Sequence, residues 1–295
     1  MKVSGRARLG LGILVLWVAT LGWHVKRQYF RPLTEVIASG ARMLPPGTSY
    51  YTVLRQDRQV GWAQSRVDTL PGGEGFLLEE RLELRLPELG GSGAAGLSTR
   101  AELGPSLSLR RFAARTAGVL GAVSVEGEVI GDSLLRARTT RDGPPDAVTA
   151  PLDGPVVLSS AVALRLAAEG SLRPGDRLRL PILDPLSLEL RPVELRVIDE
   201  AIRTYPDSAT TDDTGRWLPA RTDTVRAWLV EQELRGVRLR SWVDEDGRLL
   251  EARTIAGLRL ERTAFELAYF PYRELTSPAR ESSPVAPRER DGSGG

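Results

Sequence analysis

Alternation of apolar and charged side chains is the feature of this sequence that most constrains its fold. Leu82, Leu84 and Leu86 alternate with charged residues, and residues 186–191 repeat the pattern. A period of two predicts strands with one buried face and one solvated face, as in antiparallel sheets. The chain is therefore expected to be mainly β, with its apolar face covered by sheet closure or by helices.

Turn residues divide the predicted strands into hairpins. A polar turn at 56–59 separates apolar positions around Tyr51 from those around Trp62. The clearest meander lies near the end of the chain, where Asp-Gly and Gly turns separate four strand-like runs. These runs cover residues 225–234, 237–243, 248–255 and 258–262.

Three segments have helical character, at residues 32–44, 156–169 and 263–269. The segment 156–169 is rich in alanine and ends at a glycine, which favours a helix inside the domain. We expect an antiparallel meander that forms a curved sheet or incomplete barrel around one or two helices. Residues 207–221, which are polar, are predicted to form a loop.

The apolar run from Leu9 to Trp23 has basic residues on both sides. Leu9 to Val25 would span about 25 Å as a helix, enough for a short membrane crossing. The predicted division is a basic cytoplasmic tip (1–8), a transmembrane anchor (9–25), a stalk (26–47), an extracytoplasmic β-domain (48–275) and a disordered tail (276–295). The alternative is a cleaved signal peptide, although residues 20–22 match its small-residue cleavage pattern only loosely.

Charge is distributed unevenly along the chain. The formal net charge is +2, but removing the five bases of residues 1–27 leaves 35 bases against 38 acids. The remaining chain therefore carries about −3. A nucleic-acid partner requires a basic surface that neutralises phosphates, so this class of partner is excluded.

Missing residue types narrow the possible chemistry. The sequence has no cysteine, its only histidine is His24, and its only lysines are Lys2 and Lys26. The body of the chain therefore lacks thiolate nucleophiles, histidine-based triads, lysine Schiff bases and zinc ligands of the His or Cys type. Catalysis by a carboxylate pair, by tyrosine or by a metal with oxygen ligands stays open.

Acidic and hydroxyl clusters give no strong site. Asp207, Asp212, Asp213 and Asp223 surround a polar segment, but their spacing matches no calcium loop, and a solvated loop is favoured. The acids at 244–246 are explained by turn geometry. Ser159 and Ser160 have no histidine or lysine base. We predict no catalytic residue, no metal site and no cofactor.

Tryptophans are the better candidates for ligand contacts. Trp62, Trp228 and Trp242 lie in predicted strands, and aromatic side chains on a concave sheet can line an apolar pocket. The alternative is that they fill the core.

Short motifs resemble a family of bacterial periplasmic β-rich domains of unknown function. These motifs are Gly47-x-x-Tyr50-x-x-Val53, Val60-Gly61-Trp62-Ala63, Leu172-x-Pro174-Gly175-Asp176 and the run 242–250. In some relatives such a domain precedes a transglutaminase-like module, and its shape is similar to the half-barrels of lipoprotein carriers. The resemblance covers about residues 47–270 and implies a half-barrel. This chain has no cysteine for a transglutaminase core, so the resemblance transfers no functional residue.

Together these features predict a membrane-anchored, extracytoplasmic, non-enzymatic β-domain. It would bind a hydrophobic ligand or an envelope partner protein. One alternative is a structural or accessory subunit of a larger envelope complex. Another is a carboxylate-dependent hydrolase, which requires two acids about 5–10 Å apart in a cleft.

Overall fold

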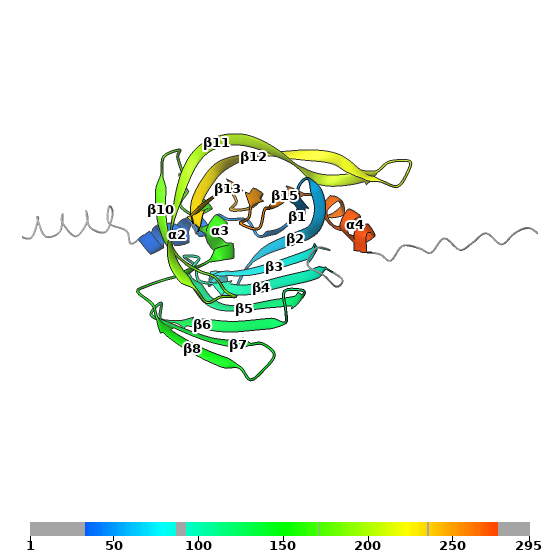
Figure 1. Cartoon of the computed structure of the whole chain (residues 1–295). Helices are drawn as coiled ribbons and strands as arrows, with labels where there is room; N and C mark the ends of the chain where they lie inside the picture. The colour runs from blue at the N-terminus through cyan, green and yellow to red at the C-terminus, as the bar shows by residue number, and fades with distance from the viewer. Residues whose placement is uncertain (1–32, 87–92, 171, 235, 277–295) are drawn as a thin grey trace, which may run out of the picture.

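The computed structural model describes residues 33–86, 93–170, 172–234 and 236–276. Their main feature is a single sheet of fifteen strands, accompanied by three α-helices (Figure 1). The strands are β1 (Gly47–Arg55), β2 (Arg58–Thr69), β3 (Phe76–Arg85), β4 (Ala94–Leu103), β5 (Leu109–Gly118), β6 (Val123–Ile130), β7 (Leu134–Thr140), β8 (Asp146–Pro151), β9 (Val157–Leu158), β10 (Arg177–Leu183), β11 (Leu190–Thr211), β12 (Trp217–Leu234), β13 (Val237–Asp244), β14 (Leu249–Arg253) and β15 (Leu258–Thr263). The helices are α2 (Leu33–Ala41), α3 (Val162–Ala167) and α4 (Phe265–Thr276).

The sheet is built from two meanders joined through the first and last strands. Its order is β8-β7-β6-β5-β4-β3-β2-β1-β15-β14-β13-β12-β11-β10-β9. The join is antiparallel and pairs Tyr51 with Arg262 and Val53 with Leu260. Strands β8 and β9 form the two edges and do not pair, so the sheet curves without closing into a barrel.

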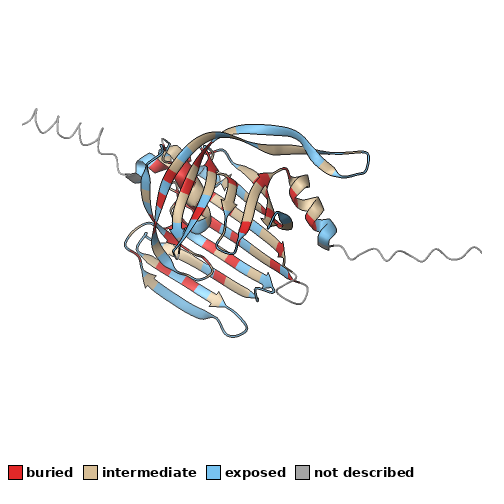
Figure 2. Ribbon diagram, turned by 45° about the horizontal axis from the view of Figure 1, so that its top comes forward, coloured by how far each residue is buried: buried red, intermediate tan, exposed pale blue. Residues whose placement is uncertain are grey.

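Helix α3 lies within the curve of the sheet (Figure 1). We call the sheet face turned toward α3 the inner face and the opposite one the outer face. Leu78 of β3 and Leu164 of α3 belong to the same buried cluster. Figure 2 shows buried and exposed residues alternating along the strands. The predicted one-sided apolar sheet around a helix, with an open rather than closed barrel, is therefore confirmed.

Helices α2 and α4 pack at other places. In α2, Ile37 and Ala41 are buried in the main core cluster. A Cβ at Gly40 would lie 2.0 Å from the carbonyl oxygen of Ala168, so only glycine allows this close approach to the end of α3. Helix α4 covers the outer face of β1 and β2, where its Ala268 and Tyr272 pack with Trp62.

One predicted loop is wrong. Residues 207–221 form the end of a long hairpin, in which β11 pairs with β12 up to Thr211 opposite Trp217. The side chain of Asp212 accepts hydrogen bonds from the backbone N–H groups of Thr214 and Arg216, at 2.9 Å each, and so stabilises the turn. We call this extension of β11 and β12, residues 202–226, the arm (Figure 1).

The helix predicted at 156–169 is shorter than expected. Val157 and Leu158 pair in parallel with β10, and a 3₁₀ turn over Ser159–Ala161 precedes α3. Conversely, α4 is longer than the helical turn predicted at 263–269. Among the described residues, no helix has the length and hydropathy needed to span a bilayer. The anchor predicted at 9–25 lies outside the described residues.

Candidate functional site: a polar row inside the half-barrel

A row of polar side chains crosses the inner face of the first four strands. Ser49 of β1 lies opposite Ser65 of β2, Ser65 lies opposite Glu80 of β3, and Glu80 lies opposite Thr99 of β4. Directly opposed residues in an antiparallel sheet share a face, so these four side chains form one line. We call them the polar row. Ser49 and Thr99 are only 5% and 6% exposed.

The polar row lines a cavity of about 190 Å³ between the sheet and the segment around α3. Ser160 and Ala163 border it from the α3 side, and Gly247 and Arg248 border it from the β13–β14 turn. Gly247 has φ +75°, and a Cβ there would lie 2.7 Å from the Cα of Leu164. The glycine therefore lets the turn pack directly on α3. The apolar walls are Ala63, Val67, Leu82, Leu97, Leu249 and Leu260.

Burial controls the ionisation of the groups in this cavity. Burial raises the pKa of Glu80 from 4.5 to about 7, and the neighbouring Ser160 hydroxyl opposes this shift only in part. Burial also raises the pKa of Tyr51 to about 12, against the opposing charge of Arg262. At neutral pH the cavity therefore holds a neutral phenol and a carboxyl group that is about half protonated.

Hydrogen-bonding capacity is left over in the cavity. The Oγ of Ser160 is buried and has no partner of ordinary hydrogen-bond geometry among the described residues. Buried polar groups normally have partners, since leaving one unsatisfied costs about 1–3 kcal/mol. The cavity is therefore suited to bind a water molecule or a ligand that forms a hydrogen bond with this hydroxyl group.

Sequence reasoning missed Glu80, although the signal is present. The side chain of Glu80 is on the same face of β3 as four apolar residues, namely Phe76, Leu78, Leu82 and Leu84. Phe76 and Leu78 are buried in the main core cluster. The alternation identified at 81–86 continues toward the N-terminus, and Glu80 interrupts its apolar face. An acid at a core position of a strand is the pattern to look for.

The three predicted tryptophans do not share a pocket, and none of them lines the cavity. Trp62 is on the outer face under α4, where its ring centroid is 5.2 Å from that of Tyr269. Trp228 is on the inner face in the core cluster around β10 to β13. Trp242 is opposite Leu229 on the outer face, with the guanidinium carbon of Arg203 4.7 Å from its ring centroid. The structure separates them because strand parity puts Trp62 and Trp242 outside the curve.

Asp244 combines the predicted turn role with a buried ion pair. Its Oδ1 accepts the backbone N–H of Asp246 at 3.1 Å and that of Arg248 at 2.7 Å, as the turn requires. Its Oδ2 accepts a hydrogen bond from Nη1 of Arg262 at 2.7 Å, and both side chains are buried. Nη2 of Arg262 also donates to the hydroxyl of Tyr205 at 2.8 Å. This network ties the turn beside the cavity to the arm.

The other predicted acid cluster is structural. Asp207 accepts a hydrogen bond from Nε of Arg221 at 2.9 Å, and Asp223 accepts one from the hydroxyl of Tyr205 at 3.1 Å. These contacts hold the arm together. Within the described parts of the chain, no group of three or more acidic or histidine side chains is placed to hold a metal ion.

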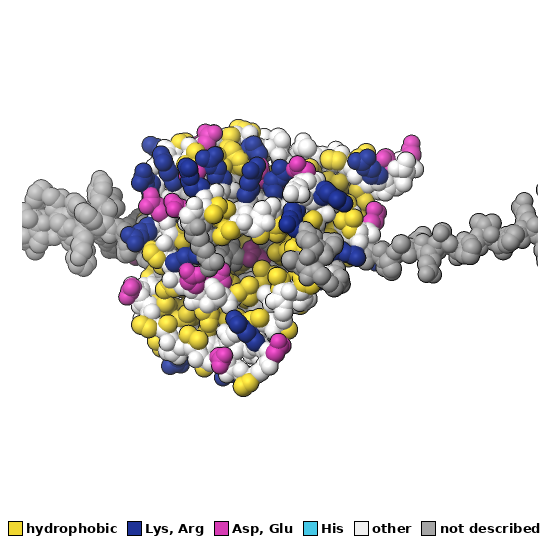
Figure 3. Space-filling model, in the orientation of Figure 1, with side chains coloured by type: hydrophobic (Ala, Val, Ile, Leu, Met, Phe, Trp, Pro, Cys, Tyr) yellow, Lys and Arg dark blue, Asp and Glu magenta, His cyan; other side chains and the backbone are white. Residues whose placement is uncertain are grey.

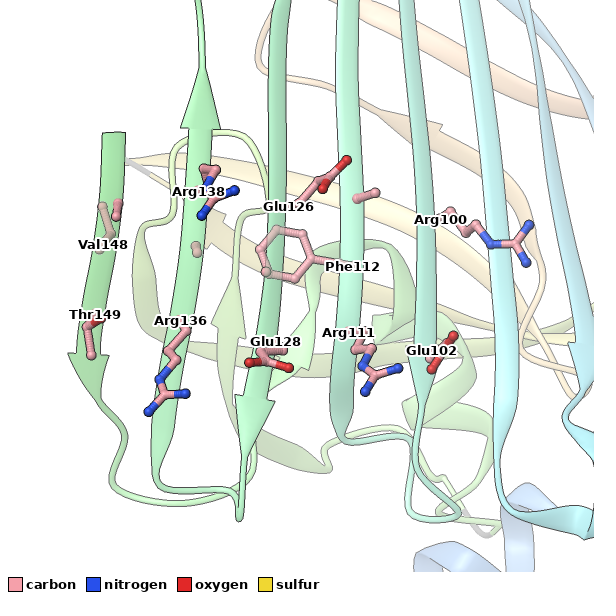
Figure 4. Close-up of a pocket in the computed structure, with 14 residues that line it drawn as sticks. Arg100, Glu102, Arg111, Phe112, Glu126, Glu128, Arg136, Arg138, Val148 and Thr149 are labelled. Carbon is pink, nitrogen blue, oxygen red and sulfur yellow. The ribbon is translucent and has the colours of Figure 1, made fainter. Parts of the chain in front are cut away.

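A larger groove of about 590 Å³ lies across β4 to β8 on the outer face (Figure 4). Two rows of charged side chains run across the strands in this groove. One row consists of Glu102, Arg111, Glu128 and Arg136, and the other of Arg100, Glu126 and Arg138. Opposite charges are cross-strand neighbours here. Exposed pairs of this kind largely neutralise each other and are screened by salt. The groove therefore provides less selective chemistry than the inner cavity.

A band of basic side chains lies across the upper part of the molecule, where β10 to β13 run (Figure 3). Two arginines of strands β10 and β13 have acidic partners on neighbouring strands. Arg177 lies 3.3 Å from Glu194, and Nε of Arg240 lies 2.8 Å from Glu231. These pairs offset part of the positive charge of the band.

Comparison with known proteins supports the fold alone. No protein-family model matches the chain, and no curated protein matches it. Among solved structures it is similar to a β-barrel-like protein with the domain of unknown function DUF1849 from Brucella abortus. That similarity has a TM-score of 0.50 and 12% identity, and it covers 75% of this chain and 97% of that one. A DUF1089 family protein from Pseudomonas aeruginosa shares 15% identity over 68% of this chain and 93% of that one, with a TM-score of 0.38.

The similarity to the Brucella abortus protein agrees with a β-rich, half-barrel-like fold. At 12% identity the similarity transfers no site residue and no activity. The resemblance to domains that precede transglutaminase-like modules stays a prediction.

Proposed function

We propose that this chain is a membrane-tethered, extracytoplasmic β-domain that binds a hydrophobic ligand in its half-barrel, without catalysis. Residues 9–25 would supply the tether. The observation that carries the proposal is the polar row, which lies beside open volume and next to apolar walls inside the half-barrel. The polar row would fix the ligand's polar end, and the leucine walls would hold its apolar part.

Size and chemistry both suit such a ligand. The cavity of about 190 Å³ exceeds the roughly 150 Å³ of an engineered cavity that binds benzene. Ligand pockets typically combine apolar walls with a few well-placed polar groups, and this cavity has both. Its volume limits the enclosed part of the ligand to a small group.

The carboxyl content favours binding over hydrolysis. Glu80 is the only carboxylate among the residues that line the cavity. A glycosidase-type mechanism needs a second acid within about 5–10 Å across the substrate. The proposal therefore gives Glu80 a role in recognition.

A binding experiment tests this proposal. The full chain with ¹³C-labelled methyl groups is titrated with three small probes of similar size: n-butylammonium, 1-butanol and butyrate. At least one should shift the methyl signals of Leu82 and Leu97 in a saturable manner. Ala163→Phe, which fills the cavity from α3, should abolish binding, as should Ser65→Leu, which fills it from β2. Ala147→Phe on exposed β8 is the control and should bind normally. Failure of all three probes to bind the wild-type chain would refute the proposal.

The arm favours a second candidate, docking of an envelope partner protein. It projects beyond the body of the sheet (Figure 1), and its Ile202 is 67% exposed. Exposed apolar side chains on a projecting element suit protein contacts. Photo-crosslinking in cells from position 202, with position 190 of β11 as the control, should then give one specific product from 202 alone. Equal or absent crosslinking at both positions would argue against this role.

A further inference from the structure

We propose that the polar row receives the positively charged head group of a small amphipathic amine, with Glu80 as its counter-ion. This inference rests on the proposed binding function and specifies the ligand class. It would place an ammonium group against β2 to β4, and the attached alkyl group among the leucines of the cavity.

The charge balance of the cavity is the first reason. Glu80 is its only carboxylate, and both arginines among its lining residues are engaged elsewhere. Nε of Arg81 donates to Glu83 at 2.8 Å on the outer side. Nη2 of Arg248 donates to the carbonyl oxygens of Pro45 and Pro46 at 3.3 and 3.4 Å. Neither guanidinium acts on the pKa of Glu80, so a bound cation would supply a counter-charge that the described residues do not provide.

The hydrogen-bonding pattern is the second reason. An ammonium group has three donors and no acceptor. Around Glu80, the hydroxyl oxygens of Ser65, Thr99 and Ser160 can all accept hydrogen bonds. The Ser160 hydroxyl is close enough to Glu80 to lower its pKa, but it makes no hydrogen bond of ordinary geometry within the described part of the chain. A carboxylate with neighbouring hydroxyl acceptors therefore matches the donors of an ammonium group. A second carboxylate, as in a fatty acid, would instead meet the like charge of Glu80.

Apolar surroundings make the match selective. The pair Leu82 and Leu97 lies next to the pair Glu80 and Thr99 on the inner face of β3 and β4. Together with Leu249 and Leu260 it forms an apolar wall of the cavity. A fully hydrated inorganic cation would gain nothing from these side chains. A short alkylammonium ion would place its carbon atoms against them and its charge on the polar row.

Binding of a cation should be linked to proton release. A cation pairs with the ionised form of Glu80, which burial keeps about half protonated near neutral pH. The other titratable groups that line this region are Tyr51 from β1 and Arg248 from the turn, with the Asp244–Arg262 pair acting on Tyr51 and with Arg81 directed to the outer side of β3. Tyr51, with its pKa raised to about 12, stays neutral between pH 6 and pH 8.

The test titrates the full chain with each of the three probes at pH 6 and at pH 8. Binding is measured from the methyl signals of the leucines that line the cavity. n-Butylammonium should bind at least tenfold tighter than 1-butanol or butyrate at pH 8. Its affinity should fall about tenfold at pH 6, since a group with pKa 7 is about 90% ionised at pH 8 and about 10% at pH 6. Glu80→Gln should remove both the preference and the pH dependence. Glu79→Gln, one residue away on the outer face, should preserve both.

Each other outcome has a distinct meaning. Equal or tighter binding of 1-butanol would overturn the cationic ligand but leave the binding function intact, and so would a preference for butyrate. Retained preference for n-butylammonium in Glu80→Gln would also overturn the inference, because the cation would then be held elsewhere. Absence of binding by every probe would refute the proposed function itself.

Discussion

Ser65 of β2 and Glu80 of β3 lie directly opposite each other in the antiparallel register, and both side chains line the inner cavity. This pairing puts a carboxyl group where the strand pattern otherwise requires an apolar residue. Burying it without a cationic partner is unfavourable for the ionised form. Glu80 should therefore lower the stability of the folded chain relative to an apolar residue at this position. Such locally unfavourable residues are typical of functional sites.

Stability should depend on pH through Glu80. Its folded pKa of about 7 lies above the ordinary 4.5, so its contribution is fully present below pH 4.5 and is lost as pH rises through 7. The loss is on the order of 3 kcal/mol. Glu80→Gln should be more stable than the wild-type chain at pH 8, with a smaller difference at pH 5, as measured by urea unfolding. Glu79→Gln should follow the wild-type pH profile. If the stability of Glu80→Gln changed with pH in the same way as that of the wild-type chain, the burial of this carboxyl would be contradicted.

The two faces of β3 should respond differently to truncation. Leu78 is 1% exposed in the main core cluster, whereas its neighbour Leu77 is half-buried on the outer face. Leu78→Ala should reduce the free energy of unfolding by roughly 2–5 kcal/mol, and Leu77→Ala by about 1 kcal/mol or less. Chemical denaturation compares the two. Similar losses would mean that the strand register is shifted by one residue.

Breaking the buried ion pair should cost more than breaking an exposed one. Asp244→Asn keeps an oxygen for the turn but leaves the Arg262 guanidinium without its charge partner, which should cost roughly 3–5 kcal/mol. The exposed pair of Arg115 and Glu126, 3.3 Å apart, serves as the comparison. Glu126→Gln should change stability by less than about 1 kcal/mol. Equal effects would show that the Asp244–Arg262 pair is solvated.

Replacing Trp62 should destabilise the chain more than replacing Trp242, because Trp62 is the more deeply buried of the two. Trp62 is 5% exposed beneath α4, so Trp62→Ala should cost roughly 3–5 kcal/mol through loss of helix packing. Trp242 is half-buried beside Arg203, and Trp242→Ala should cost less than half as much. In conditions where both variants are folded, probe binding to the cavity should be unchanged. Loss of binding in Trp242→Ala alone would indicate a ligand site on the outer face.

The sequence predicted the architecture where a strand has one apolar face. The final meander matches β12 to β15 closely, because apolar positions and Gly turns mark every strand. The arm was missed because both of its faces are largely solvated, so no apolar stripe marks it. Cross-strand pairs such as Arg221 with Asp207, and stacking of Trp217 on Phe270 at 5.1 Å, stabilise it instead. Such contacts depend on register and on α4, neither of which local periodicity reveals.

The site was less predictable than the fold. Aromatic residues indicated a pocket, but parity alone does not say which sheet face curves inward, and two of the three tryptophans lie outside. Glu80 could have been found by extending the alternation of 81–86 by one position. Its partners could not, since Ser49, Ser65 and Thr99 meet it only through the register of four strands. Ser160 approaches through the short segment before α3, whose extended start was predicted as helix.

The most direct test is an NMR titration of the Glu80 side-chain carboxyl carbon in the full chain, assigned by its absence in Glu80→Gln. The midpoint should lie near pH 7 without ligand and should move down by at least one unit in saturating n-butylammonium. A midpoint near 4.5 in the free chain, unchanged by the probe, would contradict a buried recognition carboxyl inside the half-barrel.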